Sequence, residues 1–189
     1  MPFRRSLLVL ALGCMAALPA CIVQYQVPVV RGEAAPEVRR DGDSLADARE
    51  REMAAILTGS AEQRRPRLAW NAILAQVARE RARDMAARGY FAHVAPEGLG
   101  ANTLVERAGF ALPAAYDHAL AGNNIESAAE GYDSAAAAWR DWMGSPHHRA
   151  HLLGLEPQFS AQSEFGIGFA QRPGGRVYWV VLIAEPGGR

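Results

Sequence analysis

Residues 165–184, FGIGFAQRPGGRVYWVVLIA, contain two apolar runs joined by a turn, and this arrangement decides the fold class. Large apolar residues at positions 165, 167 and 169 alternate with small or polar ones, which is the period of a β-strand. The Pro-Gly-Gly sequence at 173–175 predicts the turn. The second run, 177–184, is apolar throughout, as in a strand buried on both faces. We therefore expect an antiparallel hairpin whose second strand is central.

Segments with the period of a helix precede this hairpin. We expect helices from Ser44 to about Thr58, from Trp70 to Arg88, near Asn102 to Ala108, from about Asp133 to Met143, and from Pro146 to Leu153. Ser44 with Asp47, and Thr103 with Glu106, have the spacing of capping boxes. Glycines at 89 and 154 end two of the helices. Trp139 and Trp142 are expected to face inward. The pattern predicts an α+β domain in which helices cover a small antiparallel sheet.

The first 43 residues are expected to direct export and not to join the fold. Residues 1–21, MPFRRSLLVLALGCMAALPAC, begin with a basic segment, and their apolar stretch is too short to span about 30 Å of hydrocarbon. The sequence LPAC resembles a bacterial lipoprotein signal, so we expect cleavage after residues 1–20 and a lipid on Cys21. Ordinary signal cleavage is the alternative, because Pro19 is unusual in that box. Residues 21–43 then form a flexible tether, and 44–189 form the domain.

Composition narrows the partners and the compartment. Twenty basic residues balance twenty acidic ones, so no basic surface favours nucleic acid. Cys14 lies in the leader and Cys21 would carry the lipid, so no disulfide is expected in the domain. We therefore expect an exported bacterial envelope protein that is anchored to the membrane through Cys21. Ile22 and Val23 carry no inner-membrane retention signal, which favours the outer membrane.

Three of the five histidines lie in GSPHHRAHLLG, residues 144–154. His147 and His151 have the spacing of the two zinc ligands in an HExxH helix, but His148 stands where the essential glutamate belongs. This mismatch argues against a zinc protease. His148 would also lie in the first turn of a helix, where the dipole disfavours imidazolium. A neutral His148 could bind a metal or accept a proton, although the same reasoning fits a surface histidine.

Several segments, taken in chain order, resemble the conserved motifs of the CAP superfamily. This family contains cysteine-rich secretory proteins, antigen 5, plant pathogenesis-related proteins and bacterial SCP-like members. The matching segments are LAWNAILAQVARERARDM, YFAHVAPEG, GNNIES, SPHHRAHLL, FGIGFA and YWVVLIA. The resemblance covers about residues 45–185. It implies a three-layer α-β-α sandwich.

The resemblance also implies a site. His93 and His148 would face each other across a central cleft, as a buried pair. In some members such a pair binds zinc or another divalent cation, so these two residues are the expected metal ligands and, if there is catalysis, its groups. Asn123 stands where the family has a glutamate, and an amide is neither a base nor a good zinc ligand. Glu126 could supply the charge, but in a continuous strand positions 123 and 126 point to opposite faces. His147 and His151 are interpreted as local substitutions.

Three functions are compatible with these residues. The favoured one is a non-catalytic module whose cleft, His93, Asn123, Glu126 and His148, binds a metal ion, a lipid or another small ligand. The second is a hydrolase that uses a metal-bound water or the histidines as acid and base. A serine mechanism would need a hydroxyl set against a histidine, and no G-x-S-x-G elbow is present. The third is a structural or partner-binding role in the envelope. Of these functions, an enzymatic one is less favoured than a non-catalytic one.

Overall fold

The computed structural model describes residues 47–188. Its elements are α1 (Ala48–Gly59), β1 (Ala69–Trp70), α2 (Ala72–Arg88), α3 (Ala101–Arg107), β2 (Glu126–Glu130), α4 (Ala135–Gly144), α5 (Pro146–Leu153), α6 (Pro157–Ser160), β3 (Glu164–Gln171) and β4 (Val177–Ala184). The predicted leader and tether, residues 1–43, and Ser44 lie outside the described residues. Within the described part, every helix is too short or too polar to cross a membrane.

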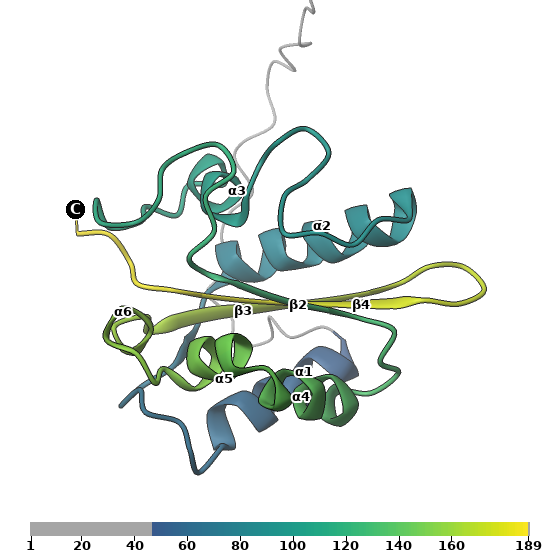
Figure 1. Cartoon of the computed structure of the whole chain (residues 1–189), viewed down its shortest axis with the longest axis horizontal. Helices are drawn as coiled ribbons and strands as arrows, with labels where there is room; N and C mark the ends of the chain where they lie inside the picture. The colour runs from purple at the N-terminus through teal and green to yellow at the C-terminus, as the bar shows by residue number, and fades with distance from the viewer. Residues whose placement is uncertain (1–46, 189) are drawn as a thin grey trace, which may run out of the picture. The chain divides into compact units, whose positions relative to one another are not determined.

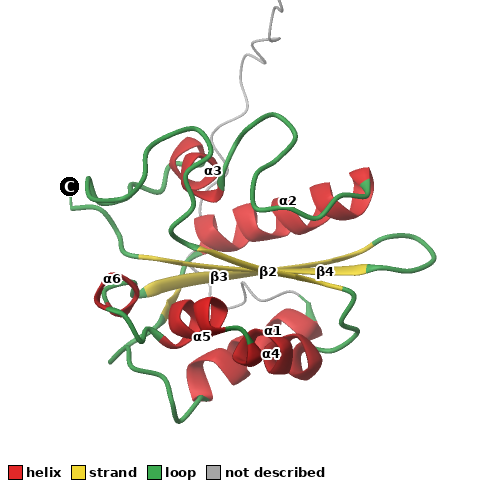
Figure 2. Cartoon of the chain, viewed as in Figure 1, coloured by secondary structure: helices red, strands yellow, loops and turns green. Residues whose placement is uncertain are grey.

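The described domain has three layers, with a four-stranded sheet between two layers of helices (Figures 1 and 2). Helices α2 and α3 lie on one face of the sheet, and α1, α4 and α5 lie on the other. The strand order is β1-β3-β4-β2, and every residue of β4 is buried, so the predicted central strand is confirmed. β4 pairs antiparallel with both neighbours, while the two-residue β1 pairs in parallel with β3. The sheet is therefore mixed, and its antiparallel part contains the predicted hairpin.

The alternation in β3 sorts its residues between the two helical layers. Phe165 and Ile167 join the buried cluster beneath α1 and α4. Gly166 and Gly168 face α2 on the opposite side, where a Cβ atom would lie 2.1 Å from the backbone of Ala75 and 2.2 Å from that of Ala78. The backbone of α2 therefore lies directly on β3. Small residues at these two positions are what permit this close approach.

Helix α2 begins later than the sequence predicts. Asn71 is its N-cap, and Oδ1 of this residue accepts hydrogen bonds from the backbone N–H groups of Ile73 (2.8 Å) and Leu74 (3.0 Å). Trp70 belongs to β1, so its predicted place in the helix is wrong. The predicted cap of α3 is also wrong, because this helix starts after Gly100 and Thr103 lies inside it. The predicted capping box of α1 is wrong as well, because Asp47 is itself the N-cap and not the third residue of a helix that starts at Ser44.

Helix α4 packs its tryptophans against the sheet, as predicted. Trp142 is fully buried, and its Nε1 donates to the carbonyl of Ala128 in β2 at 3.0 Å. Trp139 is partly buried against the same cluster. Ser134 caps the helix by accepting from Ala137 N–H. Helix α5 spans its predicted residues and ends at Gly154, whose backbone lies in the left-handed region (φ 67°). Helices α4 and α5 both contact β2.

Candidate functional site

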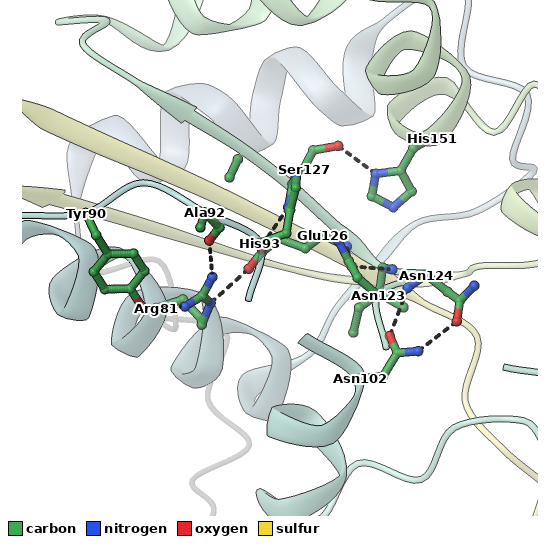
Figure 3. Close-up of polar contacts among 12 residues, drawn as sticks. Arg81, Tyr90, Ala92, His93, Asn102, Asn123, Asn124, Glu126, Ser127 and His151 are labelled. Carbon is green, nitrogen blue, oxygen red and sulfur yellow. Dashed lines mark hydrogen bonds and ion pairs between the residues drawn. The ribbon is translucent and has the colours of Figure 1, made fainter. Parts of the chain in front are cut away.

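The site forms where the start of β2 meets the loop that follows α2. His93 lies in this loop, and its Nδ1 is 2.9 Å from Oε1 of Glu126, the first residue of β2 (Figure 3). The Glu126 side chain is completely buried, whereas the His93 side chain is 47% exposed. From α2, Arg81 Nε donates to Oε2 of Glu126 at 3.1 Å. Each carboxylate oxygen of Glu126 thus has its own partner.

Arg81 ties α2, the loop and β2 together. Its guanidinium also donates to Tyr90 Oη at 2.9 Å and to the carbonyl of Ala92 at 2.7 Å. Burial acts to lower the pKa of Arg81, but the Glu126 carboxylate and Tyr90 outweigh it, and the pKa is raised. Arg81 is therefore a buried cation with Glu126 as its partner. Arg81 was not predicted as a site residue, although the sequence carries a signal: an arginine lies on the apolar face of the helix between Val77 and Met85.

Asn123 turns the chain before β2. Its Oδ1 accepts hydrogen bonds from the backbone N–H groups of Ile125 (3.3 Å) and Glu126 (3.0 Å). β2 begins only at Glu126, so residues 123–125 do not belong to a continuous strand. Side chains of this kind commonly close such turns by bonding to backbone two or three residues on. This turn is the reason that Glu126 reaches His93.

His148, the second predicted cleft histidine, lies on α5. Its Nδ1 is buried and makes no hydrogen bond within residues 47–188. Burial lowers the pKa of His148, and the charges of His93 and His147 lower it further, against Asp141. A neutral His148 was predicted, but the main cause is burial and not the helix dipole. The prediction of a buried pair is wrong for His93, whose imidazole is half exposed.

A second polar pair was not predicted. Ser127 Oγ lies 2.7 Å from Nδ1 of His151, and both residues are buried. Burial lowers the pKa of His151 to about 3; the charge of Arg65 adds to this effect, and the carbonyl of Ile183 opposes it. His151 is therefore neutral near pH 7. Its Nε2 is buried, and a hydrogen bond from the ring to the backbone carbonyl of Ile183 is what acts against the lowering of its pKa.

A hollow of about 180 Å³ lies beside these residues. It is lined by Asn123, Asn124, Glu126, His147, His151, Gln158 and Phe159. The Phe159 ring stands edge-on to the rings of His147 and His151, with centroid distances of 6.0 and 5.1 Å. Two predicted cleft residues, Asn123 and Glu126, line the hollow. His93 and His148 are not among its lining residues.

The donor set does not fit a metal ion. Zinc takes four protein ligands in structural sites and three in catalytic sites. No group of three or more His, Cys, Asp or Glu residues that could hold a metal occurs within 47–188. Glu126 already bonds to His93 through one oxygen and to the cation of Arg81 through the other. The two expected metal ligands, His93 and His148, therefore lack a carboxylate that is free to join them.

Comparison with solved structures finds one that shares the fold. An outer surface protein from Borrelia burgdorferi matches with a TM-score of 0.55 and 18% identity, over 72% of this chain and 94% of its own. An extracellular protein containing a SCP domain from Bacillus anthracis matches with a TM-score of 0.49 and 24% identity, over 64% of this chain. This chain covers only 34% of the Bacillus protein. No curated protein matches significantly.

A match to a protein-family model shows which family the chain belongs to. The model for CAP, the cysteine-rich secretory protein family, matches residues 37–183, which is most of the chain. The match includes all of the residues that form the site described above. The three-layer fold with its small mixed sheet agrees with this assignment. The chain therefore belongs to the CAP (cysteine-rich secretory protein) family.

Proposed function

We propose that this protein is an exported CAP-domain binding module, which holds a small ligand against the His93 imidazole and does not catalyse a reaction. The observation that carries the proposal is the contact between His93 and Glu126. A fully buried carboxylate holds one nitrogen of a ring that is otherwise half exposed. The ring is thereby fixed in orientation and remains open to a ligand.

The charges explain how this contact favours binding. Because the Glu126 carboxylate only accepts, the proton of a neutral His93 lies on Nδ1, and Nε2 is left as an acceptor. The guanidinium of Arg81 contacts Glu126 from the other side at 3.1 Å and so provides a counter-charge for the buried carboxylate. A group that is held in place before a ligand arrives loses little further freedom on binding. His93 is therefore a preorganised hydrogen-bond acceptor.

Catalysis is less well supported, since a nucleophile is lacking at His93. The two cysteines of the chain are at positions 14 and 21, before the domain. Ser127 follows Glu126 directly, but it is buried and bonds to His151. Ser134 is occupied in capping α4. A metal-dependent hydrolase is also poorly supported, because no group of three or more His, Cys, Asp or Glu residues within 47–188 could hold the metal ion.

One observation still favours a His-assisted hydrolase as the second candidate. A histidine whose Nδ1 is held by a carboxylate is the arrangement of an oriented general base, which could activate water through Nε2. Hydrolysis of p-nitrophenyl acetate by the wild type and by His93→Ala would decide between the two. The binding module predicts equal rates at the level of free imidazole in solution. Turnover that is lost in His93→Ala would establish the hydrolase instead.

Export and anchoring are part of the proposal. The segment 1–20 has the features of a signal peptide, and Cys21 follows it in a lipoprotein-like box. The matched structures include an extracellular protein and an outer surface protein. Labelling of cells with radioactive palmitate tests this point. We expect Cys21→Ala to lose the label and leave the membrane fraction, while the control Cys14→Ala keeps both. Label that persists in Cys21→Ala would contradict the anchor.

The binding function is tested by NMR on the purified full-length protein. Zinc chloride, sodium phosphate and sodium oleate serve as probes for a metal, an anion and a lipid. We expect at least one probe to shift the His93 ring signals, and this shift to vanish in His93→Ala. His118→Ala is the matched control, because His118 also bonds to a carboxylate, that of Glu106, outside the cleft. Shifts that survive in His93→Ala, or that vanish equally in His118→Ala, would contradict the proposal.

A further inference from the structure

We infer that the hollow beside His93 binds the oxyanion group of a ligand, a carboxylate or a phosphate, through the side-chain amides of Asn123 and Asn124. The inference rests on the proposed binding function and names the chemistry that the site selects. The hollow brings together residues from the turn before β2, from α5 and from α6. Its volume of about 180 Å³ is well above the roughly 10–15 Å³ that one water needs.

The two amides present donors. Asn123 Oδ1 accepts from the N–H groups of Ile125 and Glu126. Asn124 Oδ1 accepts from Asp117 N–H at 2.8 Å and from Asn102 Nδ2 at 2.7 Å. These bonds assign the oxygen and the nitrogen of each amide, because only an oxygen can accept them. Both Nδ2 groups are thus left without a protein acceptor in the described residues, and each offers two N–H donors.

The carboxylate in the wall does not oppose an anion strongly. Both oxygens of Glu126 are bonded, to His93 and to the cation of Arg81. Opposite charges at this separation largely cancel at the distance of a bound ligand. The Glu126–Arg81 pair therefore contributes little net charge to the hollow. What remains on the wall is mostly a set of N–H donors and aromatic rings.

A buried cation behind the wall adds a positive field. Arg65 is only 5% exposed, and it forms no ion pair with an acidic residue of the described chain. Its guanidinium donates instead to the carbonyls of His151 (2.6 Å) and Leu152 (2.9 Å) and to the amide oxygen of Gln162. The charge of Arg65 contributes to the low pKa of His151, so its field reaches a residue that lines the hollow. An uncompensated buried cation favours an anion nearby.

The His151 ring is not part of this donor set. Its Nδ1 lies 2.7 Å from Ser127 Oγ, its Nε2 is buried, and a hydrogen bond to the backbone carbonyl of Ile183 acts to raise its pKa. The amide N–H groups of Asn123 and Asn124 and the positive field of Arg65 together favour an acceptor-rich, negatively charged ligand group.

Asn123→Asp is the decisive variant. A carboxylate can still accept from the N–H groups of Ile125 and Glu126, so the turn is kept. The change removes two donors and places a negative charge on the wall. We expect oxyanion binding to weaken at least about tenfold. Asn124→Asp, which also keeps its accepted bonds, is the second test. Gln76→Glu is the charge-matched control, because Gln76 is exposed on α2 and bonds to Glu80.

The measurement is an NMR titration of the side-chain amide signals of Asn123 and Asn124 in the full-length protein. Sodium phosphate and sodium acetate are added separately, with sodium chloride at equal ionic strength as the reference. Saturable shifts with phosphate or acetate, weakened in both Asp variants and unchanged in Gln76→Glu, are expected. A response to phosphate alone or to acetate alone identifies which oxyanion the site takes.

Two results would overturn the inference. One is the absence of a saturable shift with either anion in the wild type. The other is equal binding by the wild type and by Asn123→Asp, with folding shown to be intact by the backbone spectrum. Failure of the proposed function can be told apart from failure of this inference, because the proposed function is tested by His93→Ala and the inference by Asn123→Asp. If His93→Ala changes nothing while Asn123→Asp abolishes phosphate binding, the hollow is an oxyanion site independent of the imidazole.

Discussion

The Glu126 carboxylate lies 2.9 Å from the His93 imidazole, although 33 residues separate the two in the chain. Glu126 is completely buried and bonds to Arg81 through its other oxygen, while His93 remains open to solvent. A buried ion pair thus supports an exposed histidine. The charge of Glu126 matters for folding as well as for the site, because Arg81 has no other carboxylate partner among the described residues.

Glu126→Gln is expected to destabilise the fold. The amide nearly keeps the shape but leaves the guanidinium of Arg81 buried without a counter-charge, which costs about 3 kcal/mol. Urea unfolding followed by tryptophan fluorescence measures the change. Glu130→Gln is the control on the same strand, because the Glu130–Arg176 pair is solvent-exposed and should contribute about 1 kcal/mol or less. Equal losses in the two variants would show that the buried pair has no special role.

His151 makes stability depend on pH. Its pKa is about 3 in the folded protein and about 6.5 in the unfolded chain. Between these values the unfolded chain binds a proton that the folded protein does not, so the free energy of unfolding falls as the pH is lowered through this range. Between pH 7 and pH 5 the contribution of this residue is a loss of about 2 kcal/mol.

His151→Asn removes this titration. We expect the difference in unfolding free energy between pH 7 and pH 5 to be about 2 kcal/mol smaller in the variant than in the wild type. Urea unfolding at the two pH values measures it, and all other titrating groups are common to both proteins. The same pH dependence in the two proteins would contradict the prediction, because it would mean that His151 is protonated at pH 5 in the folded protein as well as in the unfolded chain.

Gly168→Ala tests the contact between α2 and β3. The added Cβ would lie 2.2 Å from the backbone of Ala78, which neither element can relieve by a rotamer change. We expect the unfolding free energy to fall by about 3 kcal/mol, or the protein to fail to fold. Gly175→Ala in the β3–β4 turn has open space around its Cβ and should change stability by less than about 0.5 kcal/mol. A stable Gly168→Ala protein would contradict the direct packing of α2 on β3.

The two tryptophans of α4 should differ in their contributions. Trp142→Phe leaves a cavity and an unpaired carbonyl at Ala128, so a loss of about 2–3 kcal/mol is expected. Trp139→Phe, in the same helix, should cost about 1 kcal/mol or less because this ring is only partly buried. Thermal unfolding by circular dichroism ranks the two variants. A larger loss in Trp139→Phe would show that the packing of α4 is assigned to the wrong face.

Most of the fold could be predicted because it depends on local patterns. The hairpin followed from the alternation at 165–169 and from the apolar run at 177–184, since a strand between two others must be apolar on both faces. Helix α5 followed from its Pro and Gly boundaries. Errors occurred where a tertiary contact overrides a local signal. Trp70 pairs with Phe165 of β3 instead of starting α2. The residues next to Trp70 in the sequence do not indicate this pairing.

The sequence predicted which residues belong to the candidate site better than it predicted what each of them does. The sequence by itself predicted His93, Asn123, Glu126 and His148 as members of the site, because they lie in segments that follow the order of the family's motifs, and it interpreted His147 and His151 as local substitutions. Only the tertiary structure decided that Asn123 closes a turn, that this turn carries Glu126 to His93, and that Arg81 balances the charge. The physical reason is that hydrogen bonds and ion pairs depend on distances of a few ångströms. Residues 33 and 45 positions apart, such as His93 and Arg81 relative to Glu126, acquire such distances only when the sheet and its helices are in place.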